Sequence, residues 1–194
     1  MTKLTSLCVY CGARAGTDPA HRAAAERLGA LLGQNRIKLI FGAGSIGLMG
    51  VVADSALAAG GEVIGVIPHH LNRVELAHDR LTEIHIVNSM HERKQRMFEL
   101  ADAFAVLPGG LGTLDETIEI VTWRQLRLHH MPVILIDHNG YWKPLIDLVE
   151  HVVAQGFADP SVTELFTVVS SVDDIIPTIE ALPRVEESAR AEYL

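Results

Sequence analysis

Short apolar segments alternate with longer amphipathic segments along most of this 194-residue chain, and this alternation constrains the fold more than any other feature. A parallel sheet produces such a pattern, because each strand is buried on both faces and is followed by a helix that crosses back over the sheet. The apolar segments predicted to be strands are residues 4–11, 38–41, 62–67, 83–87, 103–107 and 132–137. The amphipathic segments predicted to be helices are residues 21–34, 42–59, 89–101, 113–128, 142–155 and 172–182.

This order of elements predicts an α/β protein with a Rossmann-like, doubly wound parallel sheet flanked by helices. A single domain is expected to span residues 1–182, and residues 183–194 are expected to form a charged tail. Residues 69–79 are polar and lack a regular period, so they are predicted to be a loop. Ligands of doubly wound folds bind beyond the carboxyl ends of the strands, so the segments that follow the strands are where a site is expected.

Charge and composition exclude several classes of function. The formal net charge is -8, whereas a nucleic-acid surface needs basic residues to neutralise phosphates, so no nucleic-acid partner is expected. No apolar run approaches the length of a membrane span, and the first apolar segment lacks the features of a secretion signal. We therefore expect a cytoplasmic protein with no membrane partner, in which any bound anion is held by a local pocket.

Cys8 and Cys11 are spaced as a C-x-x-C pair. A redox pair of this kind normally opens a helix, whose dipole lowers the pKa of one thiol. Here both cysteines fall in a predicted strand, where residues three apart point to opposite faces. We interpret them as two reduced structural cysteines; a redox or metal-binding pair is the alternative.

The first glycine-rich loop follows the second predicted strand and contains Gly42, Gly44, Ser45 and Gly47. Its G-x-G-x-x-G spacing matches the dinucleotide fingerprint, but an NAD site also needs an acidic residue at the end of the next strand. Glu62 has the expected offset yet begins that strand, whose end carries no acid. Three interpretations stay open: a tight turn that permits close packing, an NAD site, or backbone N–H groups that face another ligand.

The second glycine-rich loop follows the fifth predicted strand and reads Pro108-Gly109-Gly110-Leu111-Gly112-Thr113. Its glycines let the backbone approach an anion, and the helix that follows presents free N–H groups and the positive end of its dipole. The loop lacks the lysine of a P-loop, which argues against a nucleoside triphosphate with magnesium. We predict a site for a monophosphate.

Two groups of charged residues lie near these loops in the sequence. Thr113 and Glu116 have the spacing of a capping box, so Glu116 is either a helix cap or a functional carboxylate. Arg93 shares a helix face with apolar residues, so it either pairs with a carboxylate or phosphate or remains an ordinary solvated charge, as does Lys94 beside it. The adjacent histidine pairs at 69–70 and 129–130 do not have the spacing of a helical zinc site, and no G-x-S-x-G elbow is present. No metal site is predicted.

Together these segments resemble one known family, the LOG ("lonely guy") family of cytokinin riboside 5′-monophosphate phosphoribohydrolases. Residues 108–116 match its PGGxGTxxE signature, residues 90–94 match M-x-x-R-K, and residues 42–50 resemble its GGGxxGLMG block. The resemblance covers about residues 4–182, including the W-x-Q-L at 123–126 and the G-Y-W at 140–142.

The resemblance implies a reaction and a set of site residues. It implies cleavage of the N-glycosidic bond of a nucleoside 5′-monophosphate, releasing a free base and ribose 5-phosphate, with Arg93 and Glu116 as the catalytic pair. It also implies a homodimer with the active site near the interface, and no metal or organic cofactor. The residues it places at the substrate are Glu75, Lys94, Gly109, Gly110, Leu111, Gly112, Thr113, Leu114, Asp115 and, on the same helix, Glu119.

The chain departs from the family pattern at two places. The usual C-G-S-S after the first strand reads Cys11-Gly12-Ala13-Arg14 here, and the second glycine of GGG is Ala43. Two hydroxyls that could contact ligand are therefore missing, and Arg14 could supply a compensating contact. The family's historical label, lysine decarboxylase, would require a pyridoxal phosphate site with a Schiff-base lysine, for which the sequence offers no convincing candidate.

Two other functions stay open at this point, together with the identity of the base. A non-catalytic carrier of a nucleotide or phosphorylated cofactor can share this fold and an anion-binding loop. An NAD-dependent oxidoreductase is disfavoured by the missing acid. The sequence does not distinguish adenine from N6-prenylated adenine, and it leaves the proton donor to the departing base open between Asp115 and water.

Overall fold

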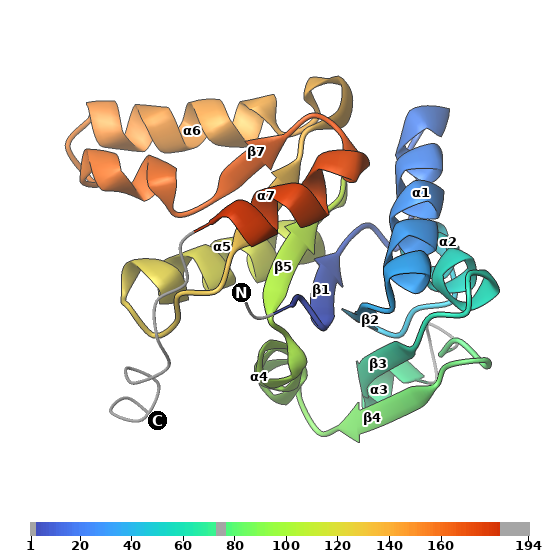
Figure 1. Ribbon diagram of the computed structural model, residues 1–194. Coiled ribbons are helices and arrows are strands. Elements are labelled where there is room, and N and C mark those ends of the chain that lie inside the picture. The colour runs from blue at the N-terminus through green and yellow to red at the C-terminus, as the bar shows by residue number, and fades with distance from the viewer. Residues whose placement is uncertain (1–2, 73–76, 183–194) are drawn as a thin grey trace.

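The computed structural model describes residues 3–72 and 77–182. Within them lies one seven-stranded parallel sheet with the order β4-β3-β2-β1-β5-β6-β7 (Figure 1). The strands are β1 (Ser6–Tyr10), β2 (Lys38–Phe41), β3 (Val63–Pro68), β4 (Glu83–Val87), β5 (Ala103–Val106), β6 (Val133–Ile136) and β7 (Thr167–Val169). The helices are α1 (Pro19–Asn35), α2 (Gly47–Ala58), α3 (His69–Asn72), α4 (Met90–Leu100), α5 (Leu111–Gln125), α6 (Lys143–Ala154) and α7 (Ile175–Ala181), and the 3-10 turns are η1 (His138–Gly140), η2 (Pro160–Glu164) and η3 (Val172–Asp174).

The strand order reverses between β1 and β5. The chain builds outward from β1 to β4, crosses back along α4, and places β5 on the other side of β1, where Leu7 pairs with Ala103 and Tyr10 with Val106. This is the topological switch point of a doubly wound sheet, where the loops after the two strands diverge and leave a crevice. The predicted fold class is confirmed.

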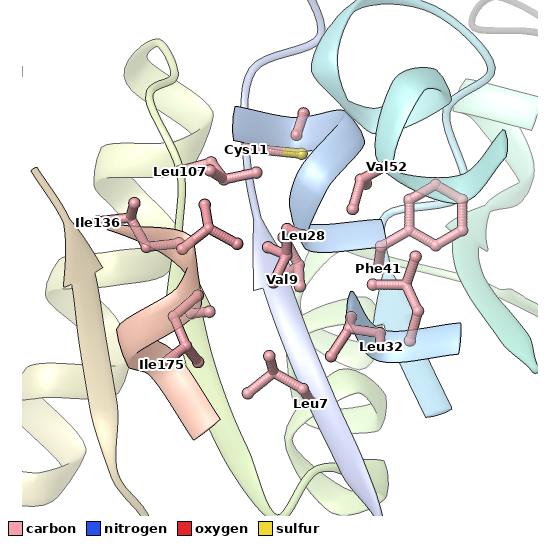
Figure 2. Close-up of a cluster of buried hydrophobic side chains, with 14 of the residues drawn as sticks. Leu7, Val9, Cys11, Leu28, Leu32, Phe41, Val52, Leu107, Ile136 and Ile175 are labelled. Carbon is pink, nitrogen blue, oxygen red and sulfur yellow. The ribbon is translucent and has the colours of Figure 1, made fainter. Parts of the chain in front are cut away.

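Two apolar cores cover the two faces of the sheet. On one face, α1, α2 and α7 contribute Leu28, Val52 and Ile175, which meet Val9 of β1 (Figure 2). On the other face, α4 and α5 contribute Met97 and Ile120 to a second cluster. Helices thus shield both faces of the sheet from water, which explains why the central strands are continuous apolar segments in the sequence.

The cysteines sit in different cores. Cys8 belongs to the cluster beneath α4 and α5, Cys11 belongs to the cluster beneath α1 and α2, and both thiols are buried and free. Burial raises the pKa of both thiols, so both are neutral at physiological pH. The prediction of two reduced structural cysteines is confirmed, and the redox-pair alternative is wrong.

The structure corrects several local expectations. Residues 69–79 do not form a loop throughout, because α3 provides one helical turn at His69–Asn72. Strand β7 was not expected: it is three residues long at the edge of the sheet, too short to show a strand period. No helix among residues 3–72 and 77–182 is long and apolar enough to cross a membrane.

Candidate functional site

A cavity of about 710 Å³ opens at the switch point between β1 and β5. Its wall combines the loop after β1, the loop after β5 and the first turns of α1, α2 and α5, together with Arg93 and Tyr141. The two loops are joined directly, because the backbone N–H of Gly12 donates to the carbonyl of Pro108 at 3.0 Å. The cavity therefore lies where the topology of the sheet predicts a ligand.

The second glycine loop forms one end of this cavity and the N-terminus of α5. Gly110 is the N-cap residue and no side chain within residues 3–72 or 77–182 caps the helix, so in this part of the chain the N–H groups of its first turn lack a capping acceptor. A Cβ at Gly109 would lie 2.1 Å from Oγ1 of Thr113, whereas a Cβ at Gly110 or Gly112 would meet nothing within 4 Å. Gly109 is thus required by packing, while Gly110 and Gly112 leave open space at the end suited to an anion.

Arg93 is buried from α4 into the cavity wall, with 8% of its surface exposed. Its Nε donates to the carbonyl of Val66 at 3.1 Å, its Nη2 donates to the carbonyl of Gly42 at 3.4 Å, and its Nη1 lies 3.4 Å from Oε1 of Glu116. The alternative of a solvated helix charge is therefore wrong for Arg93. Three segments hold the guanidinium in place and aim one edge at the Glu116 carboxylate.

Glu116 is equally buried, with 8% of its surface exposed. Removal from water raises its pKa to about 7, and the positive charge of Arg93 opposes this rise without cancelling it. Thr113 and Glu116 do not form a capping box, because the helix begins at Leu111 and both residues lie inside it. Glu116 is thus a carboxyl group at the cavity wall that gains and loses its proton near neutral pH.

Lys94 forms a separate cluster with Asp115 and Glu119 beside the cavity. Its Nζ lies 3.2 Å from Oδ2 of Asp115 and 3.0 Å from Oε2 of Glu119. Burial lowers the pKa of Lys94, but the hydrogen bonds and charges of the two carboxylates raise it by more than burial lowers it. The net shift of the Lys94 pKa is therefore upward. The cluster ties α4 to α5, and none of its residues is among those that line the cavity.

The first glycine loop serves mainly to let neighbouring parts of the protein pack closely against its backbone. A Cβ at Gly42 would lie 1.8 Å from Nη2 of Arg93, and a Cβ at Gly47, where φ is +63°, would lie 2.2 Å from the backbone of Ala13. Gly44 pairs with Ala77 in an isolated bridge. Gly42, Gly44, Ser45 and Gly47 are absent from the cavity wall, so the interpretation as a tight packing turn fits the structure best.

An NAD site is disfavoured by the same part of the structure. Glu62, the acid with the expected offset, pairs with Lys38 at 3.0 Å at the start of the strands rather than at their carboxyl ends. The space beside Gly42 is filled by the Arg93 guanidinium, which leaves no room there for a pyrophosphate.

The remaining expected site residues fall in three places. Leu111 lies at the cavity with 85% of its surface exposed, whereas Leu114 packs against the core beneath α4 and α5. Asp115 is exposed beside Lys94, away from the cavity wall. Glu75 lies outside the described residues.

The cavity residues that escaped the sequence reasoning include His21 and Tyr141. His21 comes from the first turn of α1, and Tyr141 follows β6 and donates its hydroxyl hydrogen bond to the carbonyl of Gly109. The G-Y-W at 140–142 was the available signal for Tyr141. Nothing in the sequence singles out His21, because it lies within an ordinary helical pattern.

The departures from the family pattern lie at the cavity or its support. Ala13 and Arg14 line the cavity in the loop after β1. Ala43 is fully buried and adopts φ +63°, a left-handed conformation that favours glycine. Ala43 accepts a hydrogen bond from the N–H of His78 at 3.0 Å, which ties residues 77–80 to the first glycine loop.

Comparison with known proteins identifies relatives over nearly the whole chain. A family model described as "Possible lysine decarboxylase" matches residues 49–179. A cytokinin riboside 5′-monophosphate phosphoribohydrolase of Rhodococcoides fascians is 40% identical over 177 residues, which make up 91% of this chain and 89% of that protein. A protein of the same name from Arabidopsis thaliana is 38% identical over 189 residues, covering 97% of this chain and 89% of that protein.

Solved structures agree on the fold. The molybdenum cofactor carrier protein of Chlamydomonas reinhardtii superimposes with a TM-score of 0.70, covering 92% of this chain and 97% of that chain, at 18% identity. At that identity the likeness shows a shared fold alone. The sequence relatives are far more similar, and on their identity and coverage the chain belongs to the LOG family, the family of cytokinin riboside 5′-monophosphate phosphoribohydrolases.

Proposed function

We propose that this protein hydrolyses the N-glycosidic bond of an adenosine 5′-monophosphate, with or without an N6 substituent, to give the free base and ribose 5-phosphate. The single observation that carries the proposal is the buried Arg93–Glu116 pair, which shares one cavity with an open, glycine-lined helix N-terminus. The names of the sequence relatives support the same reaction.

Glu116 is the residue that acts on the reacting bond in this proposal. Cleavage of an N-glycosidic bond builds positive charge on the ribose, as in the oxocarbenium-like transition state of glycoside hydrolysis. An ionised carboxylate beside the anomeric carbon stabilises that charge, and it can accept a proton from the attacking water. Its pKa of about 7 suits this role, because a general base is most effective when its pKa lies near the working pH.

Arg93 positions the catalytic carboxylate in this proposal, and the glycine loop binds the substrate phosphate. Arg93 is held by the carbonyls of Val66 and Gly42, so it positions the Glu116 carboxylate. The N–H groups at the start of α5 would bind the 5′-phosphate near Gly110, Gly112 and Thr113. Asp115 pairs with Lys94 away from the cavity, so water is the better candidate for the proton donor to the departing base.

The reaction needs only water as co-reactant. A lysine decarboxylase would need a free lysine at a pyridoxal phosphate, but the described residues that line the cavity include no lysine. Lys94 is occupied by two carboxylates, Lys38 by Glu62, and Lys143 by Asp147. We therefore propose that the enzyme works without pyridoxal phosphate.

Product analysis tests the proposed reaction. The purified protein is incubated with AMP and with isopentenyladenosine monophosphate without added metal, and the free base is measured by chromatography. We expect base release by the wild type and by Glu99→Gln, an exposed carboxylate of α4, and its loss in Glu116→Gln. Base release by Glu116→Gln at the wild-type rate would refute the role of Glu116, and the ratio of the two substrate rates identifies the preferred base.

A non-catalytic carrier is the second candidate, because the carrier protein of Chlamydomonas reinhardtii shares this fold. A carrier has no need for a carboxylate of raised pKa buried beside its anion site, which favours the enzyme. Tight binding of both nucleotides with no base release in any sample would support the carrier instead.

We also propose a homodimer with the cavity near its interface. Leu111 borders the cavity with 85% of its surface exposed, and Ile118 of α5 is 45% exposed, so a second subunit covering α5 would bury both. Sedimentation equilibrium tests the subunit count, and a Leu111→Glu variant that remains dimeric would contradict this placement of the interface.

A further inference from the structure

The charges that line the cavity do not balance a bound phosphate. The protein carries a formal net charge of -8, and the charged or titratable side chains of the cavity wall include Arg14, His21, Arg93 and Glu116. The positive charge of Arg93 faces the Glu116 carboxylate at 3.4 Å and two backbone carbonyls. If Arg93 remains with these partners, a bound phosphate must find its side-chain partners at Arg14 and His21.

His21 is placed as a ligand-binding residue would be. It is the third residue of α1, with only 9% of its surface exposed, and its Nδ1 is buried without a hydrogen-bond partner among the described residues. A buried polar atom left unpaired is costly, so such an atom beside a cavity calls for an external partner. The imidazole thus has unused hydrogen-bonding capacity at the cavity wall.

Contacts tie His21 to the phosphate end of the cavity rather than to the Arg93 end. Its ring packs edge-on against Tyr141 with centroids 5.3 Å apart, and the Tyr141 hydroxyl donates to the carbonyl of Gly109. A Cβ at Gly16 would lie 3.1 Å from Cδ2 of His21, so the loop after β1 also presses on the ring. His21, Tyr141 and Gly109 therefore form one continuous contact chain beside the glycine loop.

Arg14 lies in the same loop and is free to complete this end. It is exposed, borders the cavity, and makes no hydrogen bond or ion pair that the described residues supply. It stands where the family pattern has a serine, so it adds a positive charge in place of a hydroxyl. A guanidinium binds phosphate oxygens through paired hydrogen bonds, which a serine cannot do.

Asp18, the carboxylate three residues before His21, is occupied by other partners. Asp18 caps α1 by accepting a hydrogen bond from the N–H of Ala20 at 2.9 Å, and it also accepts one from Asn139 at 3.1 Å. These hydrogen bonds, chiefly the one from Ala20, lower the pKa of Asp18, and the charges of His21 and His138 contribute in the same direction. Asp18 is therefore occupied by Ala20 and Asn139, and among the described residues it leaves Nδ1 of His21 without a hydrogen-bond partner.

We propose that His21 and Arg14 form a phosphate-binding wall, in which the His21 imidazole and the Arg14 guanidinium contact the 5′-phosphate opposite the glycine loop, so that this enzyme selects phosphorylated nucleosides through two side chains as well as backbone N–H groups. The proposal rests on the proposed function for the identity of the ligand. His21 and Arg14 act as binding and specificity residues, and neither takes part in bond cleavage.

The test separates phosphate binding from turnover. Ribose 5-phosphate is titrated calorimetrically into the wild type, His21→Phe, His21→Gln and Arg14→Gln, with Arg22→Gln as the matched control. Arg22 neighbours His21 but is exposed and pairs with Glu26, so its loss should leave affinity unchanged. His21→Phe keeps an aromatic ring against Tyr141 and removes both ring nitrogens, which guards against a merely structural effect.

We expect His21→Phe and Arg14→Gln each to weaken ribose 5-phosphate binding about ten- to hundredfold, the range for loss of a charged hydrogen bond. His21→Gln, which keeps a donor, should recover part of the affinity. In turnover assays with AMP, both losses should appear in KM, with kcat changed less than about threefold. The melting temperature of His21→Phe should stay close to that of the wild type.

Three outcomes are decisive. Wild-type affinity in His21→Phe and Arg14→Gln would overturn the proposal even if AMP is cleaved normally. A drop in kcat at unchanged KM would also overturn it, because a role in chemistry would then replace the role in binding. Weakened ribose 5-phosphate binding in a protein that releases no base would support the phosphate wall while refuting the proposed reaction.

Discussion

The raised pKa of Glu116 predicts that its replacement by glutamine changes how stability depends on pH. The carboxyl group is buried and its pKa is raised from 4.5 to about 7, chiefly because the fold removes it from water. In the unfolded chain the same group ionises near its ordinary value. At any pH at which Glu116 is ionised in the unfolded chain but protonated in the folded protein, this difference lowers the free energy of unfolding.

The sign and size of this pH dependence follow from the difference between the pKa of Glu116 in the folded and unfolded states. Below pH 4.5 the group is protonated in both states and contributes nothing. As the pH rises towards 7, the unfolded state loses its proton first, so the wild type loses stability until the folded group ionises as well. At 1.36 kcal/mol per pH unit, the full loss is about 3 kcal/mol, reached above pH 7. Glu116→Gln lacks this loss, so the free energy of unfolding of the variant should rise relative to the wild type by about that amount between pH 4.5 and 7.

Urea unfolding of both proteins at intervals from pH 4 to 8 measures this difference. The attraction of Arg93 for ionised Glu116 is already contained in the pKa of about 7, so it adds nothing further to the slope. Any effect of the substitution that does not depend on pH shifts the whole difference curve without changing its slope. Asp102→Asn is a control of opposite sign. Although burial raises the pKa of Asp102, hydrogen bonds from Thr5 and Ser6 lower it overall, so its stabilising effect should be lost only as the pH falls below about 4.

A flat difference curve between the wild type and Glu116→Gln would refute the reasoning, because burial would then not control this carboxyl group. A curve that falls with rising pH would mean that the charge of Arg93 outweighs desolvation and that Glu116 is always ionised. That result would also remove the argument for a general base with a pKa near the working pH.

Three further substitutions test the packing of the site and the core. Gly42→Ala places a Cβ 1.8 Å from Nη2 of Arg93, so the guanidinium must move, and we expect kcat to fall by about a hundredfold or more while circular dichroism stays native. Tyr141→Phe removes the hydrogen bond to the Gly109 carbonyl, and KM for AMP should rise by about two- to tenfold with stability nearly unchanged in thermal unfolding. Leu28→Ala empties a fully buried position between α1 and the sheet (Figure 2), and urea unfolding should show a loss of about 2–5 kcal/mol without any change in KM.

The sheet could be predicted from sequence because its central strands are buried on both faces. Strands β2 and β4 have the predicted bounds, and the helices α1, α4 and α5 begin or end within a few residues of the predictions. The short edge strand β7 could not be predicted, since three residues carry no period and its pairing partner β6 lies far away in the chain.

The candidate site was predicted in its members but not in its geometry. The glycine loop and its helix follow from local residues, because a strand, a glycine turn and a helix are consecutive in the chain. Whether Arg93 is solvated or buried could not be decided locally, since its partners come from β3, the loop after β2, and α5. The same limit applies to His21 and Tyr141, which meet only because β1 and β6 end at the same edge of the sheet.

The two glycine loops are similar in sequence, but the glycines of the first accommodate atoms of the protein and two glycines of the second border the open cavity. At Gly42 and Gly47 an added Cβ would strike atoms of the protein itself, Nη2 of Arg93 and the backbone of Ala13. At Gly110 and Gly112 an added Cβ would meet only open space in the cavity. Gly42, which is in close contact with Arg93, allows that side chain to reach its position. Gly110 and Gly112, which face open space, leave room for a ligand. The first loop therefore belongs to the enzyme's positioning of Arg93, and the second to its recognition of the substrate, although both sit at the same kind of strand-to-helix turn.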